Sequence, residues 1–516
     1  MGIEASGVAK KKTITDIHLP TLDKIIQTGR IAPLSQEDGD TLQTALHTMA
    51  ELLLPKWRNN EKLSSLAGFK KREKPPSEPK PGHGRHKADD YEGAQHVSIP
   101  HPDLTSGCAC PDPDCRGKVY PLKNDPSPLV RIIGMPPLQA TVYDLEKLRC
   151  NACTKVYTAP PPDTIGPEKY DATVASMIGL FRYGMGMPFH RLEGLQGYLK
   201  VPMPASTQWE LVEDAAELVK PIYDALTDEA AQGDVLHTDD TSVRILKVLR
   251  SPDDKRTGLH TTGVVSVADE GRRFVALYMS GRQHAGENLA DVLALRHTDK
   301  PGPTLMGDAS SWNTSKLSKA AEVFIANCLA HGRRKVVEQY TNCPTECLHI
   351  LDELGTVYLH DEEAAQQGLN AKERLKYHQL KSEPVMKRLR AWMAKQFADR
   401  TIEENSGLGK AIKYLQTHWN ELTLFLRHAG APLDNTRVER ALKRAVLHRK
   451  NSLFYKTLHG AQVGDIFMSI IHTCELNEVN PFDYLTELQR HPIEVRSAPA
   501  LWLPWNYREQ LLPAPD

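Results

Sequence analysis

The sequence predicts a multidomain α/β protein, because strand-like stretches follow one another in its centre and then alternate with helical ones. Three strand-like stretches lie at 235–246, 260–268 and 272–280, and the first two are rich in β-branched residues. A helical stretch at 286–296 then leads into a short strand that ends at Asp308. Three strands in succession, followed by alternating helices and strands, are typical of a mixed sheet layered with helices.

Length and composition limit the class of protein. A chain of 516 residues exceeds what one hydrophobic core usually serves, so several domains are expected. The formal net charge of −1 excludes a uniformly basic protein, so a polyanionic partner must be bound by local patches. No stretch approaches the roughly 20 consecutive apolar residues of a membrane span. The N-terminal stretch lacks the apolar segment of a secretory signal, so we expect a cytoplasmic protein with no membrane association.

The N-terminal hundred residues predict a helical module followed by a linker. Apolar residues at three- and four-residue spacing predict helix within 1–55. Residues 56–100 are rich in Pro, Gly and Lys without an apolar period, which is typical of an exposed linker. Ten Lys or Arg oppose five Asp or Glu there between Lys56 and Asp90, which suits either phosphate binding or a solvated linker. The candidate phosphate-binding residues are Lys70, Lys71, Arg72 and Arg85.

Two pairs of cysteines predict a zinc ribbon over residues 101–160. Each pair is followed by a turn residue and then by Lys-Val-Tyr, and strand-like sequence separates the pairs. A structural Zn²⁺ needs four soft ligands at about 2.3 Å, and two tight turns present them in pairs. Cys108 is a rival for the first ligand, and a cluster of buried thiols is the alternative to a metal site. The predicted ligands of one structural Zn²⁺ are Cys110, Cys115, Cys150 and Cys153.

Three carboxylates occupy positions from which they can converge at one edge of the predicted sheet. Asp239 lies on the first strand, Asp308 ends the fourth, and Glu439 lies on the first turns of a basic helix. Clustered carboxylates repel one another unless cations neutralise them, and hard oxygen ligands select Mg²⁺ or Mn²⁺. Two such ions about 3.5–4 Å apart activate a water or a 3′-hydroxyl for in-line attack on phosphorus. This pattern indicates nuclease or strand-transfer chemistry.

Each acid also has a simpler explanation. Asp239 and Asp240 together suit a β-bulge or a hairpin tip, Asp308 suits a loop cap, and Glu439 suits a helical ion pair with Lys443. Strand alternation sends Asp239 and Asp240 to opposite faces, so we expect only one of them to bind the metal, and we assign Asp239.

A series of motifs resembles the IS66 family of bacterial insertion-sequence transposases. The resemblance covers roughly residue 80 to the end, and Thr436 stands where the family often has asparagine. The motifs are "HTDDTSVRIL", "GRQHAGENLADVL", "MGDASSWN", "NCLAHGRRK", "PLDNTRVERALKRAVLHRKNSLFYKTLHGAQVGD" and "HTCELNEVNPFDYLTELQRH".

The resemblance implies an RNase H-like catalytic core with a DDE triad. Matched motif by motif, the triad falls on Asp239, Asp308 and Glu439, which would bind two Mg²⁺ or Mn²⁺. The implied activity is binding to the inverted-repeat ends of the element, cleavage of phosphodiester bonds and joining of 3′-hydroxyl ends to target DNA. Bringing two ends together implies a homodimer or a higher oligomer on DNA in the bacterial nucleoid, with accessory element-encoded proteins as further candidate partners.

The resemblance and the element pattern together predict a domain order and further DNA contacts. The predicted segments after the ribbon are a helical DNA-binding or connecting region (161–231), the first part of the core (232–334), a helical insertion (335–430), the closing core helices (431–475) and a C-terminal tail (476–516). Arginine forks suit phosphate oxygens. The candidate DNA contacts in and after the core are His331, Arg333, Arg334, Lys443, Arg449 and Lys450.

Two other functions fit parts of the pattern. A DNA-binding regulator would use the ribbon and linker while the sheet domain stays inert. A nuclease on the same fold would cut DNA without joining ends.

Overall fold

The computed structural model describes much of the chain between residues 102 and 512. The described ranges are 102–112, 114–120, 137–149, 156–162, 168–248, 258–309 and 323–512. The chain divides into two units, Met1–Ile133 and Gly134–Asp516. The predicted N-terminal module and basic linker lie outside the described residues, and the boundary between the units falls inside the predicted ribbon.

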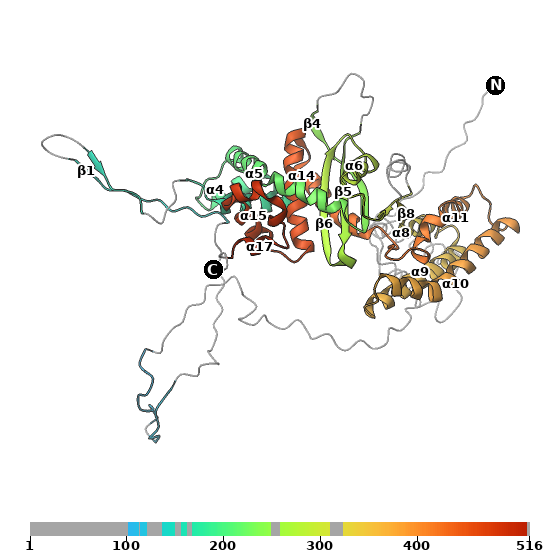
Figure 1. Cartoon of the computed structure of the whole chain (residues 1–516), viewed down its shortest axis with the longest axis horizontal. Coiled ribbons are helices and arrows are strands. Elements are labelled where there is room, and N and C mark those ends of the chain that lie inside the picture. The colour runs from blue at the N-terminus through green and yellow to red at the C-terminus, as the bar shows by residue number, and fades with distance from the viewer. Residues whose placement is uncertain are drawn as a thin grey trace, which may run out of the picture. The chain divides into compact units, whose positions relative to one another are not determined.

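A five-stranded mixed sheet organises the second unit, with the strand order β6-β5-β3-β7-β8 (Figure 1). β5 runs antiparallel to both β3 and β6, whereas β7 runs parallel to β3 and to β8. The predicted mixed α/β architecture is therefore confirmed. The strands are β3 (Val235–Ser242), β5 (His260–Ala268), β6 (Arg273–Gly281), β7 (Thr304–Gly307) and β8 (Phe324–Asn327), and α6 (Ala285–Leu293) connects β6 to β7.

The first strand is shorter than the predicted stretch 235–246. β3 ends at Ser242, and the next residues form the separate strand β4 (Ile245–Lys247). β4 pairs in parallel with β9 (Tyr455–Thr457), far along the chain, so a tertiary contact overrides the continuous β-branched pattern.

The sequence of residues 324–331 is strand-like, but the strand formed there is shorter. It ends at Asn327, and α8 (Leu329–Val337) begins two residues later. α8 buries Leu329, Gly332 and Val336, and these three- and four-residue spacings suit one helix face. His331, Arg333 and Arg334 consequently lie on a helix.

Helices precede the sheet, as the spacing of apolar residues over 165–232 predicts. Along the longest of them, Val212, Val219, Ile222 and Leu226 are fully buried, and this stripe packs against β6. The elements are α3 (Ala172–Gly179), the π-helical η3 (Leu180–Gly184), α4 (Phe189–Tyr198) and α5 (Ala205–Ala231).

Ser206 and Thr207 are residue types that suit a helix cap, but α5 begins before them, at Ala205 directly after Pro204. Proline needs no amide hydrogen bond and fixes a backbone angle compatible with a helix start. The buried Gln208 side chain holds this entry by donating to the Met203 carbonyl at 2.8 Å.

The helix α14 (Leu458–Leu476) forms hydrogen bonds with β6, the edge strand of the sheet. Four side chains on and just after α14, spaced four residues apart, accept hydrogen bonds from alternate N–H groups of β6. Four helical residues rise about 6 Å and two strand residues about 6.6 Å, so the two spacings nearly match. Figure 1 shows α14 alongside the sheet. The donor and acceptor pairs are Ser280 with Asp465 (2.6 Å), Tyr278 with Ser469 (2.9 Å), Ala276 with Thr473 (3.0 Å) and Phe274 with Asn477 (3.2 Å).

The stretch 335–430 is largely helical, as predicted. α9 and α10 pack side by side, and Asp361 joins them by accepting from Arg374 Nε at 2.8 Å and contacting His378 Nε2 at 3.0 Å. The elements are α9 (Pro344–Gln366), α10 (Ala371–Ala398), α11 (Gly407–Thr417), α12 (Trp419–Leu422) and η6 (Leu424–Leu426).

The C-terminal segment, which we had labelled only as a tail, is folded onto the helices. Tyr484, Leu485 and Leu488 are fully buried on one face of α15, which packs against α3 and α5. The elements beyond the sheet are α13 (Thr436–Ser452), α14, α15 (Pro481–Arg490), α16 (Pro492–Ser497), η7 (Pro499–Trp502) and α17 (Tyr507–Gln510).

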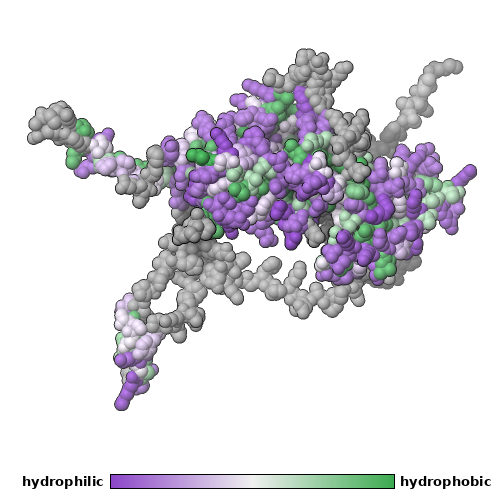
Figure 2. Space-filling model, viewed as in Figure 1, coloured by the Kyte–Doolittle hydropathy of each residue, from purple (hydrophilic) through white to green (hydrophobic). Residues whose placement is uncertain are grey.

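The surface of the second unit is mainly polar on the side that can be seen in Figure 2, where hydrophobic residues form small separate patches. Within the described ranges, the helices are too short or too polar to traverse a lipid bilayer.

Asp465, which accepts hydrogen bonds from β6, makes the stability of the protein depend on pH. Burial raises the pKa of Asp465 to about 7, although two hydrogen bonds from Ser280 act in the opposite direction. Because this folded-state pKa exceeds the unfolded value of about 3.9, the associated stabilisation is complete below about pH 4 and is lost as the pH rises to about 7.

Asp465→Asn removes the titration, and the amide can accept from the Ser280 N–H through Oδ1 while its Nδ2 donates to Ser280 Oγ, which reverses that second hydrogen bond. At pH 8 we expect the variant to exceed the native protein in unfolding free energy by about 2–4 kcal/mol, with the two converging near pH 4. Urea unfolding followed by circular dichroism from pH 4 to pH 8 measures this. Parallel pH profiles of the two proteins would contradict the assignment.

Candidate active site

Asp239 and Asp308 occupy matching positions on neighbouring parallel strands. The last paired residues of β3 and β7 are His237 and Met306. Continuing this register by two residues sets Asp308, directly after β7, beside Asp239. Neighbouring strands lie about 4.8 Å apart, so the two carboxylates leave the same end of the sheet close together.

Glu439 reaches this end of the sheet from the first turn of α13. α13 packs across β3 and β5, and a Cβ atom on Gly263 would lie only 2.8 Å from Leu442 Cδ2. Gly263 is the partner of Asp239 in the β3–β5 register, so α13 covers the face to which Asp239 points. The glycine thus permits the close approach that brings Glu439 toward the two aspartates.

The three carboxylates share one electrostatic environment. Burial is the main cause that raises the pKa of Asp239 to about 7. The charges of Asp308 and Glu439 raise this pKa further. The Asp240 N–H donates to Asp239 Oδ1 at 2.8 Å and lowers the pKa. A partly buried group of acids favours either protonation or a bound cation. Its all-oxygen donor set fits Mg²⁺ or Mn²⁺.

Two further side chains adjoin Glu439. His331 Nδ1 lies 3.8 Å from Glu439 Oε1, and a ligand atom of Cys328 lies within 4.8 Å of both. Burial raises the pKa of the Cys328 thiol to about 12, so the thiol stays neutral. His331 Nδ1 and Glu439 Oε1 are buried atoms that lack a hydrogen-bond partner among the described residues. Such orphaned atoms are typical of a site that another group completes.

Asn435, the residue before α13, fastens this helix to the sheet. It is fully buried, its Oδ1 lies 3.1 Å from His237 Nδ1, and its Nδ2 donates to the Thr238 carbonyl at 2.9 Å. Burial lowers the pKa of His237 to about 4, so the neutral ring donates its Nδ1 proton to the amide oxygen. The Asn435 N–H also points to Cys328 Sγ at 3.3 Å. Asn435 therefore positions Glu439 relative to Asp239.

The sequence motifs did not single out His237, Asn435 or Cys328 as functional residues. The one available signal was Asn435 directly before the basic helix, a position and residue type typical of a helix cap. Asn435 does directly precede α13, but its side chain forms a hydrogen bond with β3 and does not cap the helix.

Apart from His331 and Arg449, the predicted DNA-binding residues fall into three groups. Lys443 and Lys450 are exposed along one side of α13, and Arg334 is exposed on α8. Arg333 is partly buried, and this burial lowers the pKa of its guanidinium. The predicted contacts in the linker, Lys70, Lys71, Arg72 and Arg85, lie outside the described residues.

Arg449 differs from its neighbours on α13 because its guanidinium is bound to the end of β3. Its Nη1 donates to Thr241 Oγ1 at 3.1 Å, to Ser242 Oγ at 2.7 Å and to the Ser242 carbonyl. These bonds link the C-terminal part of α13 to the strand that carries Asp239.

The first predicted zinc knuckle is a tight turn. The Cys110 N–H donates to the Gly117 carbonyl at 2.9 Å, and the Gly117 N–H points to Cys115 Sγ at 3.4 Å. The thiols of Cys108, Cys110 and Cys115 form no disulfide. In the second unit, β1 (Lys147–Arg149) and β2 (Val156–Thr158) form an antiparallel hairpin. Cys150 and Cys153 fall in its connection, outside the described residues, so the four-cysteine site stays a prediction.

The chain matches a family model described as "Transposase IS66 family" over residues 169–463, which include the sheet, the three acids and α13. It is 27% identical over 420 residues to "Uncharacterized protein y4jD" of Sinorhizobium fredii (strain NBRC 101917 / NGR234), and the alignment covers 78% of each chain. It is 25% identical over 391 residues to "Uncharacterized protein y4hP" of the same strain, covering 70% of this chain and 67% of that one.

Proposed function

Because the chain belongs to the IS66 family of transposases, we propose that it is a DDE transposase with an RNase H-like core. It binds the inverted-repeat ends of its element, cleaves phosphodiester bonds there and joins the freed 3′-hydroxyl ends to target DNA. This proposal is supported by the register of β3 with β7, which sets Asp308 beside Asp239, and by the charges of Asp308 and Glu439, which help to raise the pKa of Asp239. Three antiparallel strands followed by two parallel ones support the RNase H-like core.

The catalytic residues in this proposal are Asp239, Asp308 and Glu439, which hold two Mg²⁺ or Mn²⁺. When bound, such a pair supplies an activated attacking oxygen and stabilises the leaving oxygen at phosphorus. Asp239 presents its carboxylate from a rigid central strand, and Glu439 presents its own from a helix that Asn435 fastens to that strand. His331, next to Glu439, orients that carboxylate or contacts the scissile phosphate.

The proposed DNA surface includes α13 and the cysteine-rich region. Lys443 and Lys450 would contact phosphates beside the catalytic acids, with Arg334 on α8 as a further contact. The basic linker and a ribbon holding one Zn²⁺ would recognise the ends. Two ends must meet, so we propose that at least two copies act together on DNA, with or without other element-encoded proteins.

A cleavage and joining assay tests the proposal. The substrate is labelled DNA carrying the inverted repeats that bracket the gene, offered intact or already cut at its 3′ end, together with plasmid target DNA. We expect nicking at the repeat and joining of the pre-cut end with Mg²⁺ or Mn²⁺, and neither product with EDTA. Binding without nicking under every metal condition would favour a regulator, and nicking without joining would favour a nuclease.

A further inference from the structure

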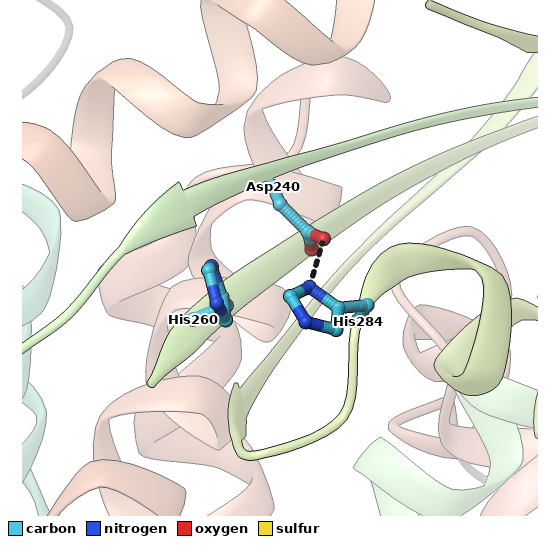
Figure 3. Close-up of side chains that lie close together, drawn as sticks. All are labelled: Asp240, His260 and His284. Atoms are coloured by element: carbon cyan, nitrogen blue, oxygen red, sulfur yellow. Dashed lines mark ion pairs between the residues drawn. The ribbon is translucent and has the colours of Figure 1, made fainter. Parts of the chain in front are cut away.

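Asp240, His260 and His284 bring a carboxylate and two imidazoles together near the end of β3 (Figure 3). His260 is the first residue of β5, and His284 directly precedes α6. One ligand atom from each of the three residues lies within 4.8 Å of the other two. Asp240 Oδ2 is 3.5 Å from His284 Nδ1, and the two ring centroids are 4.2 Å apart.

This cluster lies on the opposite face of β3 from the catalytic acids. Successive strand residues point to opposite faces, and Asp240 pairs with Thr262 where Asp239 pairs with Gly263. α13 packs over the Gly263 side, whereas on the other side the Ala285 N–H of α6 donates to Asp240 Oδ2 at 2.8 Å. The cluster is therefore separate from the site proposed for catalysis.

Hydrogen bonds from residues outside the cluster fix the orientation of the Asp240 carboxylate. Thr262 Oγ1 donates to Asp240 Oδ1 at 2.6 Å, and Asn288 Nδ2 donates to Thr262 Oγ1 at 2.7 Å. Each carboxylate oxygen accepts more than one partner, so these bonds leave acceptor capacity on the side facing His284. Supporting hydrogen bonds of this kind orient the ligands of metal sites in proteins.

We propose that Asp240, His260 and His284 bind a divalent transition-metal ion of the Zn²⁺ type. Two imidazoles and one carboxylate with an open fourth position are the ligand set of many three-ligand zinc sites. Ligand atoms around a tetrahedral Zn²⁺ are about 3.3 Å apart, given bonds of about 2.0–2.1 Å. Asp240 Oδ2 and His284 Nδ1 are already close to this spacing, at 3.5 Å. Rotation of the partly exposed His260 side chain would bring its ring nitrogen to the same distance from these two atoms. The side chains of His284 and Asp240 keep 22% and 18% exposure, which lets a water complete the shell.

Zinc content of the full-length protein tests the site. The protein is stripped with a chelator, equilibrated with excess Mg²⁺ to occupy hard-ligand sites, loaded with ZnCl₂, desalted and assayed by mass spectrometry. His260→Gln and His284→Gln are compared with His297→Gln, which removes an exposed histidine elsewhere. We expect each cluster variant to bind one Zn²⁺ per chain fewer than the native protein and than His297→Gln.

Cobalt spectroscopy separates this site from the predicted cysteine ribbon. Co²⁺ bound to thiolates shows intense charge-transfer bands, whereas Co²⁺ bound by imidazole and carboxylate shows only weak visible bands. We expect His260→Gln to lose weak bands and to keep the thiolate bands, with an unchanged circular dichroism spectrum. Equal zinc content in all variants, or a native Co²⁺ spectrum with thiolate bands alone, would overturn the proposal. Neither readout depends on DNA cleavage.

Discussion

Asp239→Asn is expected to lower cleavage of element-end DNA by at least about 10³-fold while the Kd for the same DNA changes by less than about twofold. Asparagine preserves the size of the side chain and the acceptor for the Asp240 N–H. It removes the anionic oxygen that a hard divalent cation requires. Single-turnover nicking with Mg²⁺ measures the rate, and a gel-shift titration with Ca²⁺ measures binding without cleavage.

Asp299→Asn provides the matched control, because it removes an exposed aspartate elsewhere in the second unit. This control should nick at the native rate. If Asp239→Asn nicked as fast as the control, the assignment of the first catalytic acid would be wrong. A loss of end binding in Asp239→Asn alone would instead show that Asp239 contributes to DNA binding.

Asn435→Ala should destabilise the protein by about 2–5 kcal/mol and reduce nicking more than DNA binding. The substitution leaves the buried His237 Nδ1–H and the Thr238 carbonyl without the partner that Asn435 supplies. It also releases the start of α13 from β3, so Glu439 loses its fixed position relative to Asp239. Urea unfolding measures the first effect, and single-turnover nicking at saturating protein measures the second.

Two further variants serve as comparisons for Asn435→Ala. Asn435→Asp keeps an acceptor for His237 but loses the donor to Thr238, so we expect a loss of stability between those of the native protein and Asn435→Ala. Asn342→Ala changes an exposed asparagine and should behave like the native protein. An unfolding midpoint of Asn435→Ala equal to that of Asn342→Ala would rule out the positioning role.

The main architecture could be predicted from the sequence because its signals are local. Strand-like sequence identified β3, β5 and β6, and apolar spacing identified the helices around them. The family resemblance is confirmed by the match over residues 169–463. The acids of the proposed triad were selected through motifs at the ends of predicted elements, and the register of β3 with β7 sets two of these acids, Asp239 and Asp308, side by side.

What the sequence did not predict depends on contacts between distant segments. The bond between His237 and Asn435 joins residues 198 positions apart, and no local pattern indicates it. The polar side chains of α14 at four-residue spacing resemble a solvated helix face, yet they are bound to β6. Likewise, β3 ends early because Ile245 pairs with Tyr455, more than two hundred residues away.

The bonds from α14 to β6 also restrict how the copies that we propose to act together can contact one another. An unpaired edge strand can form hydrogen bonds with a strand of a neighbouring chain, which leads to domain swapping or fibrous aggregates at high local concentration. Here alternate main-chain donors of β6 are already occupied by side chains of the same polypeptide. Copies of this chain that associate must therefore do so through surfaces other than the β6 edge, where lateral growth of the sheet is blocked.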